Sequence, residues 1–354
     1  MPAITTTPQY LLASNLSAVF IKTQATLGAF DDPTSGAGYG NNAVRVVGTP
    51  KFTPRGAAII QRADVMTPWG GNQSSKTGGL GWDITLTTEL FWQLGQNYDA
   101  TLSTLTQLHA LFLASPWAVT NPGGDDAQLA VQPLFYAEEV RTTVNLATQP
   151  FSIVYEETGG KRFEAYDCVA VPKLSWEYGQ KISIEWTIKG KWLPVTDATG
   201  AVPTYRGAAT EPPLVGVDCN LSLSGYFDNV NAVSKVTIDT GWAINDVADF
   251  RETHGFGLGF INLAASPSIE LDVADLPEGN ESDWGSAEAN TIFGGPLTLS
   301  LNVGSYAITF TLANPQPANF PTPGELNSYR TNTVKFQGIP DSATPVMTWK
   351  FEGV

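Results

Sequence analysis

The alternation of apolar and polar residues is clearest between residues 166 and 192, where it predicts a β-hairpin. Four apolar residues in the second half of this stretch are spaced two apart: Ile182, Ile184, Trp186 and Ile188. Since successive side chains of a strand point to opposite faces, we expect one face to be buried and the other to meet water. The first half changes phase at Pro172, which indicates a bulge or an edge position. Gly179 can take the positive φ that the connecting turn needs.

The same pattern over the rest of the chain predicts a mainly β fold. Thr, Ser, Val, Ile and aromatic residues favour strands, and 34 Gly and 24 Pro provide many turns. Besides the hairpin, strands are expected at residues 43–47, 56–62, 82–90, 128–133, 142–146, 151–156, 217–224, 234–239, 257–262, 268–273, 297–303, 306–312, 331–337 and 346–351.

Two segments have helical spacing. Residues 99–114 carry a leucine-rich stripe after an N-cap at Asp99 or Thr101, and Ser115-Pro116 ends the helix. Residues 283–293 predict a shorter helix, which two glycines end. Each helix lies between groups of strands, so the two halves of the chain have the same order of elements, which suggests duplication.

The chain divides most simply into two domains of moderate size. We predict an N-terminal arm at residues 1–42, a first domain at 43–193 and a second domain at 214–354. Residues 194–213, rich in Pro and Gly, predict the linker.

A polar loop at residues 64–80 interrupts the first predicted domain. Loops of this length in a compact domain are usually functional or disordered. A Gly-rich loop that exposes Trp69 has little reason to exist on a monomer, so we expect this loop to contact another subunit. The candidate contact residues are Met66, Trp69, Asn72 and Lys76.

The charge of the chain limits its partners. Charged residues make up 15% of the sequence, against about a quarter in typical domains, which indicates that part of the surface is covered by other subunits. The formal net charge of −15 argues against binding of nucleic acid through its phosphates, which requires clustered Lys and Arg. Most of the net negative charge lies in residues 206–354, which have 17 Asp and Glu but 6 Lys and Arg.

Catalytic and metal-binding patterns are missing from the sequence. It contains no G-x-S-x-G, H-E-x-x-H, C-x-x-C or phosphate-binding glycine loop. Asp31 and Asp32 lack the alternating spacing and the distal Glu of a calcium loop, and His109 and His254 have no ligand companions nearby. We therefore expect no enzymatic activity, no cofactor and no metal ion; a glycosidase stays open as an alternative only because its two carboxylates can come from anywhere in a fold.

The sequence also gives no sign of export or of membrane insertion. The N-terminus lacks the basic region of a signal peptide, and no apolar run approaches the roughly 18 residues of a membrane span. Cys168 and Cys219 are the two cysteines, and a buried thiol is expected for each, since two cysteines imply no disulfide framework.

Several segments, in this order along the chain, resemble the major tail tube protein of long non-contractile-tailed bacteriophages. The segments that carry the resemblance are residues 19–30, 44–55, 62–71, 87–90, 166–192, 234–242 and 306–312. Leu27 and the pair Gln24-Ala25 depart from the family's usual Tyr and Glu. The resemblance implies two tandem tube-type β-sandwich or barrel domains, each with a flanking helix.

The resemblance also implies a virion structural protein. Two such domains in one chain imply trimeric, pseudo-hexameric rings that stack into the hollow tail tube, through which the double-stranded DNA genome passes without specific binding. Implied partners are further copies of the chain and the terminator, tape measure and distal tail proteins. Assembly would take place in the host cytoplasm, and no membrane is involved.

Within such a tube, residues 64–80 or the arm would reach the next ring. The polar side of the hairpin, with Glu185 and Lys189, would face the bore or a seam between subunits. An alternative from another class is a tail-tip adhesion or carbohydrate-binding β-module, because a β protein with 10 Trp can present aromatic platforms to sugars.

Overall fold

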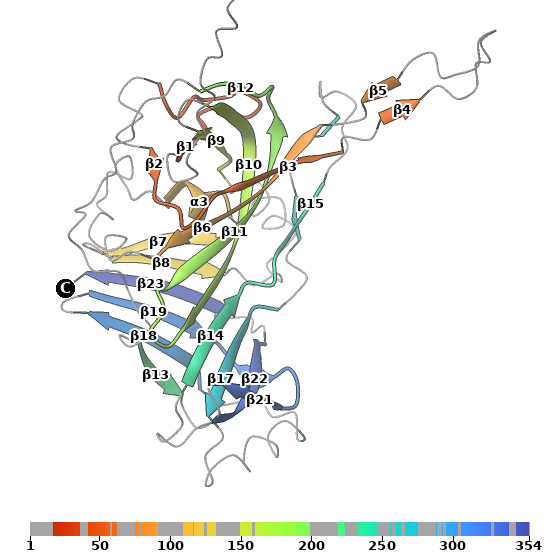
Figure 1. Ribbon diagram of the computed structural model, residues 1–354. Coiled ribbons are helices and arrows are strands. Elements are labelled where there is room, and N and C mark those ends of the chain that lie inside the picture. The colour runs from red at the N-terminus through yellow and green to blue at the C-terminus, as the bar shows by residue number, and fades with distance from the viewer. Residues whose placement is uncertain are drawn as a thin grey trace, which may run out of the picture.

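The computed structural model confirms that the protein is mainly β, with antiparallel sheets (Figure 1). It describes residues 17–35, 42–56, 59–61, 75–77, 80–90, 109–115, 117–123, 126–131, 149–157, 160–198, 219–223, 233–246, 255–256, 260–262, 266–274, 288, 292, 295–303, 306–326, 329–339 and 345–353. Two large sheets and two small ladders account for the strands in this part of the chain.

The main sheet has 13 strands. They are β1 (Ser17–Thr23), β2 (Ala43–Val44), β3 (Lys51–Arg55), β6 (Gly81–Glu89), β9 (Phe151–Glu157), β10 (Lys161–Glu177), β11 (Ser183–Trp192), β12 (Thr196–Asp197), β14 (Val233–Asp239), β17 (Ser268–Ala274), β20 (Pro315–Pro317), β21 (Thr322–Leu326) and β22 (Tyr329–Gly338). It therefore contains strands from both predicted domains and from the predicted linker, while the domain boundaries themselves stay a prediction.

The main sheet branches at β10, its longest strand. One side of β10 pairs with β11 over most of its length. The other side pairs with β9 along its first half and with β14 along its last five residues, from Lys173 opposite Asp239 to Glu177 opposite Lys235. A path β3-β6-β11-β10-β14-β17-β22 thus runs without a break from the first half of the chain into the second.

The bulge of the hairpin lies earlier than the sequence indicated. The register between β10 and β11 shifts between Tyr166 and Val169 and is regular through Pro172, so the predicted position was wrong, and β10 is not an edge strand. Six successive residues, 167–172, are buried. A strand covered on both faces loses its alternation, which explains the phase change.

The second sheet has six strands, stacked in the order β13-β18-β19-β23-β8-β7 (Figure 1). Their bounds are β7 (Trp117–Gly123), β8 (Asp126–Val131), β13 (Cys219–Leu223), β18 (Leu297–Val303), β19 (Tyr306–Leu312) and β23 (Met347–Gly353). Here too the halves meet, because β8 from the first half pairs with β23 from the second.

One helix, α3 (His109–Leu113), is described, and it is the end of the predicted helix at 99–114. The earlier turns of that helix and nearly all of the segment at 283–293 lie outside the described residues. The two small ladders are β4 (Ile59–Gln61) with β5 (Ser75–Thr77), and β15 (Ala243–Asn245) with β16 (Phe260–Asn262).

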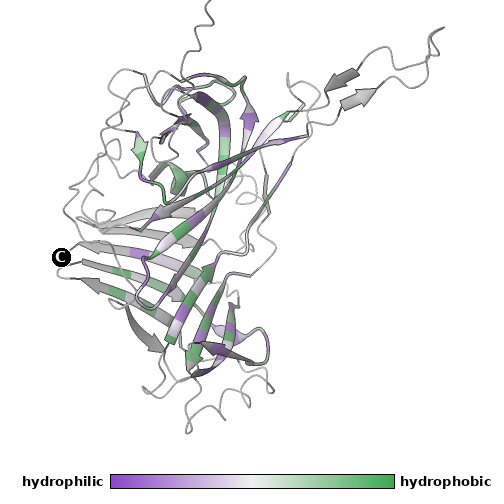
Figure 2. Cartoon of the chain, in the orientation of Figure 1, coloured by the Kyte–Doolittle hydropathy of each residue, from purple (hydrophilic) through white to green (hydrophobic). Residues whose placement is uncertain are grey.

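A single apolar cluster joins the two sheets and α3. Phe112 of α3 packs edge-on against Trp186 of β11 at 5.1 Å between ring centroids and against Trp349 of β23 at 6.0 Å. Trp349 in turn contacts Phe310 of β19 at 5.3 Å. Strands of the main sheet change between hydrophobic and hydrophilic along their length (Figure 2), because alternate residues enter this core.

Replacing Trp186 with Ala is expected to destabilise the fold strongly. The side chain is fully buried and its Nε1 donates to Thr88 Oγ1 at 2.9 Å, so its removal leaves a cavity and an unpaired hydroxyl. We expect the free energy of unfolding, measured in urea, to fall by about 3–5 kcal/mol. Glu185→Ala, the neighbouring position on the wet face, should change it by less than about 0.5 kcal/mol. Equal effects of the two substitutions would contradict the assigned faces.

Candidate functional site

The polar face of the main sheet is the candidate functional surface, because it continues across both halves of the chain. Directly opposed residues of antiparallel strands lie on the same face, and the register therefore assigns the polar side chains to rows. The first row is Thr87, Glu185, Lys173, Asp239, Ser268 and Gln337, on β6, β11, β10, β14, β17 and β22.

Two further rows lie beside the first. The second is Glu89, Ser183, Ser175, Thr237, Glu270 and Lys335, and the third, nearer the turn of the hairpin, is Glu177, Lys235, Asp272 and Thr333. These rows contain charged side chains and small hydroxyl side chains, with one amide at Gln337. Within these three rows the face is polar, uncharged in places and free of large apolar side chains.

Opposite charges meet across the strands of this face. Lys173 lies 3.6 Å from Asp239, and Lys235 lies 3.8 Å from Glu177, so both contacts join the two halves of the chain. These side chains are substantially exposed, and such pairs are worth about 0–1 kcal/mol each. Their effect is therefore on the charge pattern of the surface more than on stability.

A shallow hollow of about 290 Å³ lies over the junction of β10, β14, β17 and β22. Its charged lining comes from Lys173, Lys235, Lys335, Asp239 and Glu270. Because cations and carboxylates alternate there, the hollow holds no strong potential of one sign.

The predicted residues Glu185 and Lys189 both lie on the polar side of β11. Glu185 is exposed and belongs to the first row. Lys189 lies 3.3 Å from Asp246, which also pairs with Arg55 of β3 at 2.7 Å. Lys189 therefore makes a contact between the two halves within one chain.

The sequence did not indicate the part of this face that comes from the second half. Asp239 and Lys235 join this face only through the pairing of β10 with β14, which places Asp239 opposite Lys173, the register partner of Glu185. Equal alternation in 234–239 and 183–189 is the one signal in the sequence that could have suggested it, and it does not specify which strands pair.

The predicted inter-ring loop falls partly within the described residues. Lys76 lies in β5 opposite Ile60, while Met66, Trp69 and Asn72 lie outside them. The β4–β5 ladder pairs with no other strand of the described chain, and it projects away from the body at the upper right of Figure 1.

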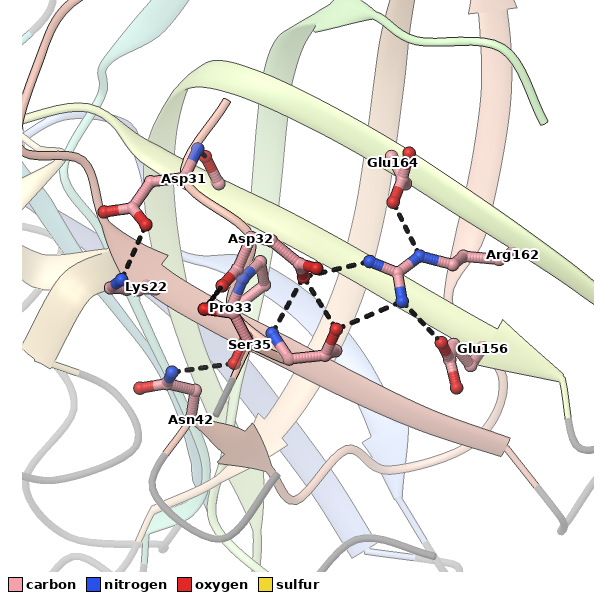
Figure 3. Close-up of polar contacts among 11 residues, drawn as sticks. Lys22, Asp31, Asp32, Pro33, Ser35, Asn42, Glu156, Arg162 and Glu164 are labelled. Atoms are coloured by element: carbon pink, nitrogen blue, oxygen red, sulfur yellow. Dashed lines mark hydrogen bonds and ion pairs between the residues drawn. The ribbon is translucent and has the colours of Figure 1, made fainter. Parts of the chain in front are cut away.

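The segment after β1 is fixed to the body by a buried cation (Figure 3). Arg162 donates to Asp32 at 2.9 Å, to Glu156 at 2.8 Å and to Glu164 at 2.6 Å, and its side chain is 8% exposed. Lys22 pairs with Asp31 at 2.6 Å. Both aspartates that the sequence offered as a weak calcium pattern are thus partners of basic side chains.

The ion pairs around Arg162 shift its pKa and that of Asp32. Burial acts to raise the pKa of Asp32, but hydrogen bonds from Thr34 and the charge of Arg162 outweigh it, so the pKa lies below its ordinary value. Burial acts to lower the pKa of Arg162, and its three carboxylate partners together raise it. Burial, aided by the charge of Asp167, raises the pKa of the Cys168 thiol well above its usual range, which keeps that thiol protonated.

Other binding features are few in the described chain. Within the described residues, no three His, Cys, Asp or Glu side chains come close enough together to hold a metal ion. No helix of that part of the chain is both long and apolar enough to cross a membrane. Neither a family model nor a curated protein matches the sequence.

Replacing Arg162 with Met should destabilise the protein at neutral pH. The change removes the ion pair between Arg162 and Glu156, whose side chain is 3% exposed, and removing one partner of a buried pair costs about 3–5 kcal/mol. Urea unfolding would measure the loss. Lys161→Met, which breaks an exposed pair with Asp197, is the control and should have little effect.

The effect of Arg162→Met should also shrink in acid. Because the folded-state pKa of Asp32 is lowered, its contribution is complete above the unfolded-state pKa and is lost as the pH falls through the folded value. The difference in free energy of unfolding between wild type and variant is therefore expected to narrow below about pH 4. A constant difference down to acid pH would exclude Asp32 from the network that stabilises the fold.

Proposed function

We propose that the protein is the tube subunit of a non-contractile phage tail, a virion structural protein that assembles into stacked rings. The observation that supports this proposal best is the continuous polar face of the main sheet, which runs through both halves of one chain. A tube for DNA needs a long, wet inner surface without gaps, and a sheet shared by two repeats supplies one.

The edges of this sheet suit ring formation. Among the described strands, β3 pairs with β6 alone, and β20 and β21 pair with β22 alone. No further strand of the described chain lies beyond these edges, so a strand of another copy could pair there, which would remove the edges and close a barrel. With two repeats per chain, we propose a trimeric, pseudo-hexameric ring made of two tube-type β-sandwich domains in each chain.

The polar face is assigned to the bore because the other face of the sheet is already covered. The apolar side packs against the second sheet and α3, so the rows with Glu185 and Lys173 remain for the water-filled interior. Lysines lie beside carboxylates in these rows, so neither strong attraction nor strong repulsion acts on passing phosphates. Double-stranded DNA would slide through without specific binding.

The projecting β4–β5 hairpin and residues 62–74 between its strands would connect one ring to the next. It pairs with no strand of either large sheet in the described chain, which leaves its outer edges for another subunit in this proposal. The terminator, tape measure and distal tail proteins are the further partners of this proposal, with assembly in the host cytoplasm and no enzymatic role.

The alternative, an adhesion or carbohydrate-binding module, fits the tryptophans less well. A sugar platform requires an exposed aromatic ring, whereas the side chains of five described tryptophans are buried: Trp82, Trp176, Trp186, Trp242 and Trp349. Binding of the unassembled protein on a glycan array, without tubes at high concentration, would favour this alternative.

Negative-stain microscopy of the concentrated protein tests the proposal directly, and hollow tubes are the expected result. Replacing residues 59–77 by a short Gly-Ser linker should abolish long tubes, because the hairpin is proposed to connect the rings. Rings or single subunits should remain folded, because the hairpin contributes no strand to the large sheets. A circular dichroism spectrum of wild-type shape is the control for folding. Normal tubes from the shortened chain would refute the inter-ring role.

The assignment of the polar face to the bore has its own test. Glu185→Cys is expected to react with a small maleimide in assembled tubes, which reaches it through the bore, but not with a bulky polyethylene glycol maleimide. Asp197→Cys, at a position that is exposed on the single chain, tests a surface outside these rows. Free reaction of Glu185→Cys with the bulky reagent would place the face outside, and protection from both reagents would place it in a seam.

A further inference from the structure

One lysine–carboxylate pair of the described chain is shielded from water on both sides. Lys191 Nζ lies 2.8 Å from Asp167 Oδ2, and the two side chains are 7% and 0% exposed. Other lysine pairs are much wetter: Lys161 and Asp197 are 59% and 87% exposed, and Lys181 with Glu89 is 57% and 21% exposed. Burying two charges together is costly. A reaction between the two side chains that removes both charges would therefore be favoured.

The backbone holds the carboxylate of Asp167 in a fixed position. Asp167 lies at the bulge of β10 with a φ of 49°, in the left-handed region that Asp tolerates better than most residues. Its backbone N–H donates to Gln24 Oε1 at 2.7 Å. The side chain is thereby fixed opposite β11, where Lys191 is the register partner of Tyr166.

The two oxygens of the carboxylate have different surroundings. Oδ1 accepts from the Gly28 backbone N–H at 2.9 Å and from Gln24 Nε2 at 3.1 Å. Oδ2 has the Lys191 ammonium beside it but no hydrogen bond of ordinary geometry in the described structure. This is the arrangement of an acyl group with an oxyanion hole on one oxygen and a nucleophile beside the other.

We propose that Lys191 and Asp167 condense to an intramolecular isopeptide bond. The ammonium passes one proton to Oδ2, and the neutral amine attacks Cγ, while the charge that develops on Oδ1 is stabilised by the two N–H donors. A second proton then moves from the nitrogen to the Oδ2 hydroxyl, which leaves as water. The product is a Nζ–Cγ amide whose carbonyl oxygen, Oδ1, keeps both donors, and no other reactant is needed.

The surroundings favour this reaction over its reverse. The register between β10 and β11 holds the amine and the carboxylate side by side. The reaction therefore does not pay the entropy cost of bringing two free reactants together. Burial keeps bulk water from the amide once the released molecule has left. The bond removes two buried charges and closes a covalent link across the hairpin that joins both halves of the main sheet, independently of whether the chain forms a tube.

Intact-mass spectrometry of the denatured full-length protein tests the proposal. The measured mass of the wild type is expected to be one water below the mass calculated from its sequence. The Lys191→Arg protein should have its full calculated mass, since arginine keeps the charge but cannot condense. Trypsin should release a branched peptide that joins residues 163–173 to residues 190–206. Lys161→Arg, at the exposed pair with Asp197, should keep the full mass deficit.

Gln24→Leu tests the oxyanion contact. It removes one donor to Oδ1 and is expected to lower the cross-linked fraction at a fixed time after purification. A wild-type mass without the deficit, or two separate tryptic peptides in place of the branched one, would overturn the proposal even if the Lys191→Arg protein failed to fold.

Discussion

The pairing of β10 with β14 is the constraint on which the rest of the structure depends. Five residues of β10, from Lys173 to Glu177, carry β14 on one side, while β11 covers most of that segment on the other. Through these contacts the strands of the second half continue the sheet of the first. Without these contacts the first polar row would end at Lys173, and no polar surface would continue from the first half of the chain into the second. The proposed bore therefore depends on a few backbone hydrogen bonds more than on any single side chain.

The interior makes that junction possible. Phe112 of α3 contacts both Trp186 of the main sheet and Trp349 of the second sheet, so the apolar side of the shared sheet is closed by strands of both halves. Because this side is covered, the polar side is the one available to solvent or to a bore. In the proposed ring, other copies would cover part of the remaining surface, which agrees with the low share of charged residues.

Two buried polar groups fix the segment before the first domain. Arg162 holds Asp32, and Asp167 holds Gln24 and Gly28. Because these buried polar groups are paired, they do not destabilise the β core. Together they hold a loop in which Leu27 is exposed. A segment predicted to be a turn-rich arm is thus attached to the sheet as far as residue 35, because long-range partners replace the local structure that it lacks.

The sequence by itself determined the class of the fold, most of the strands and their wet faces, since alternation is a local property of each segment. It correctly placed Glu185 and Lys189 on a polar face and Trp186 in the core. Only the tertiary structure decided that β10 pairs with β14, that the bulge lies near Asp167 instead of at Pro172, and that Lys191 meets a buried carboxylate. Strands pair through backbone N–H and C=O groups, which nearly every residue has. The same alternating pattern is therefore compatible with many choices of partner strand and register. Packing of the described strands around the apolar cluster that joins both sheets selects among them.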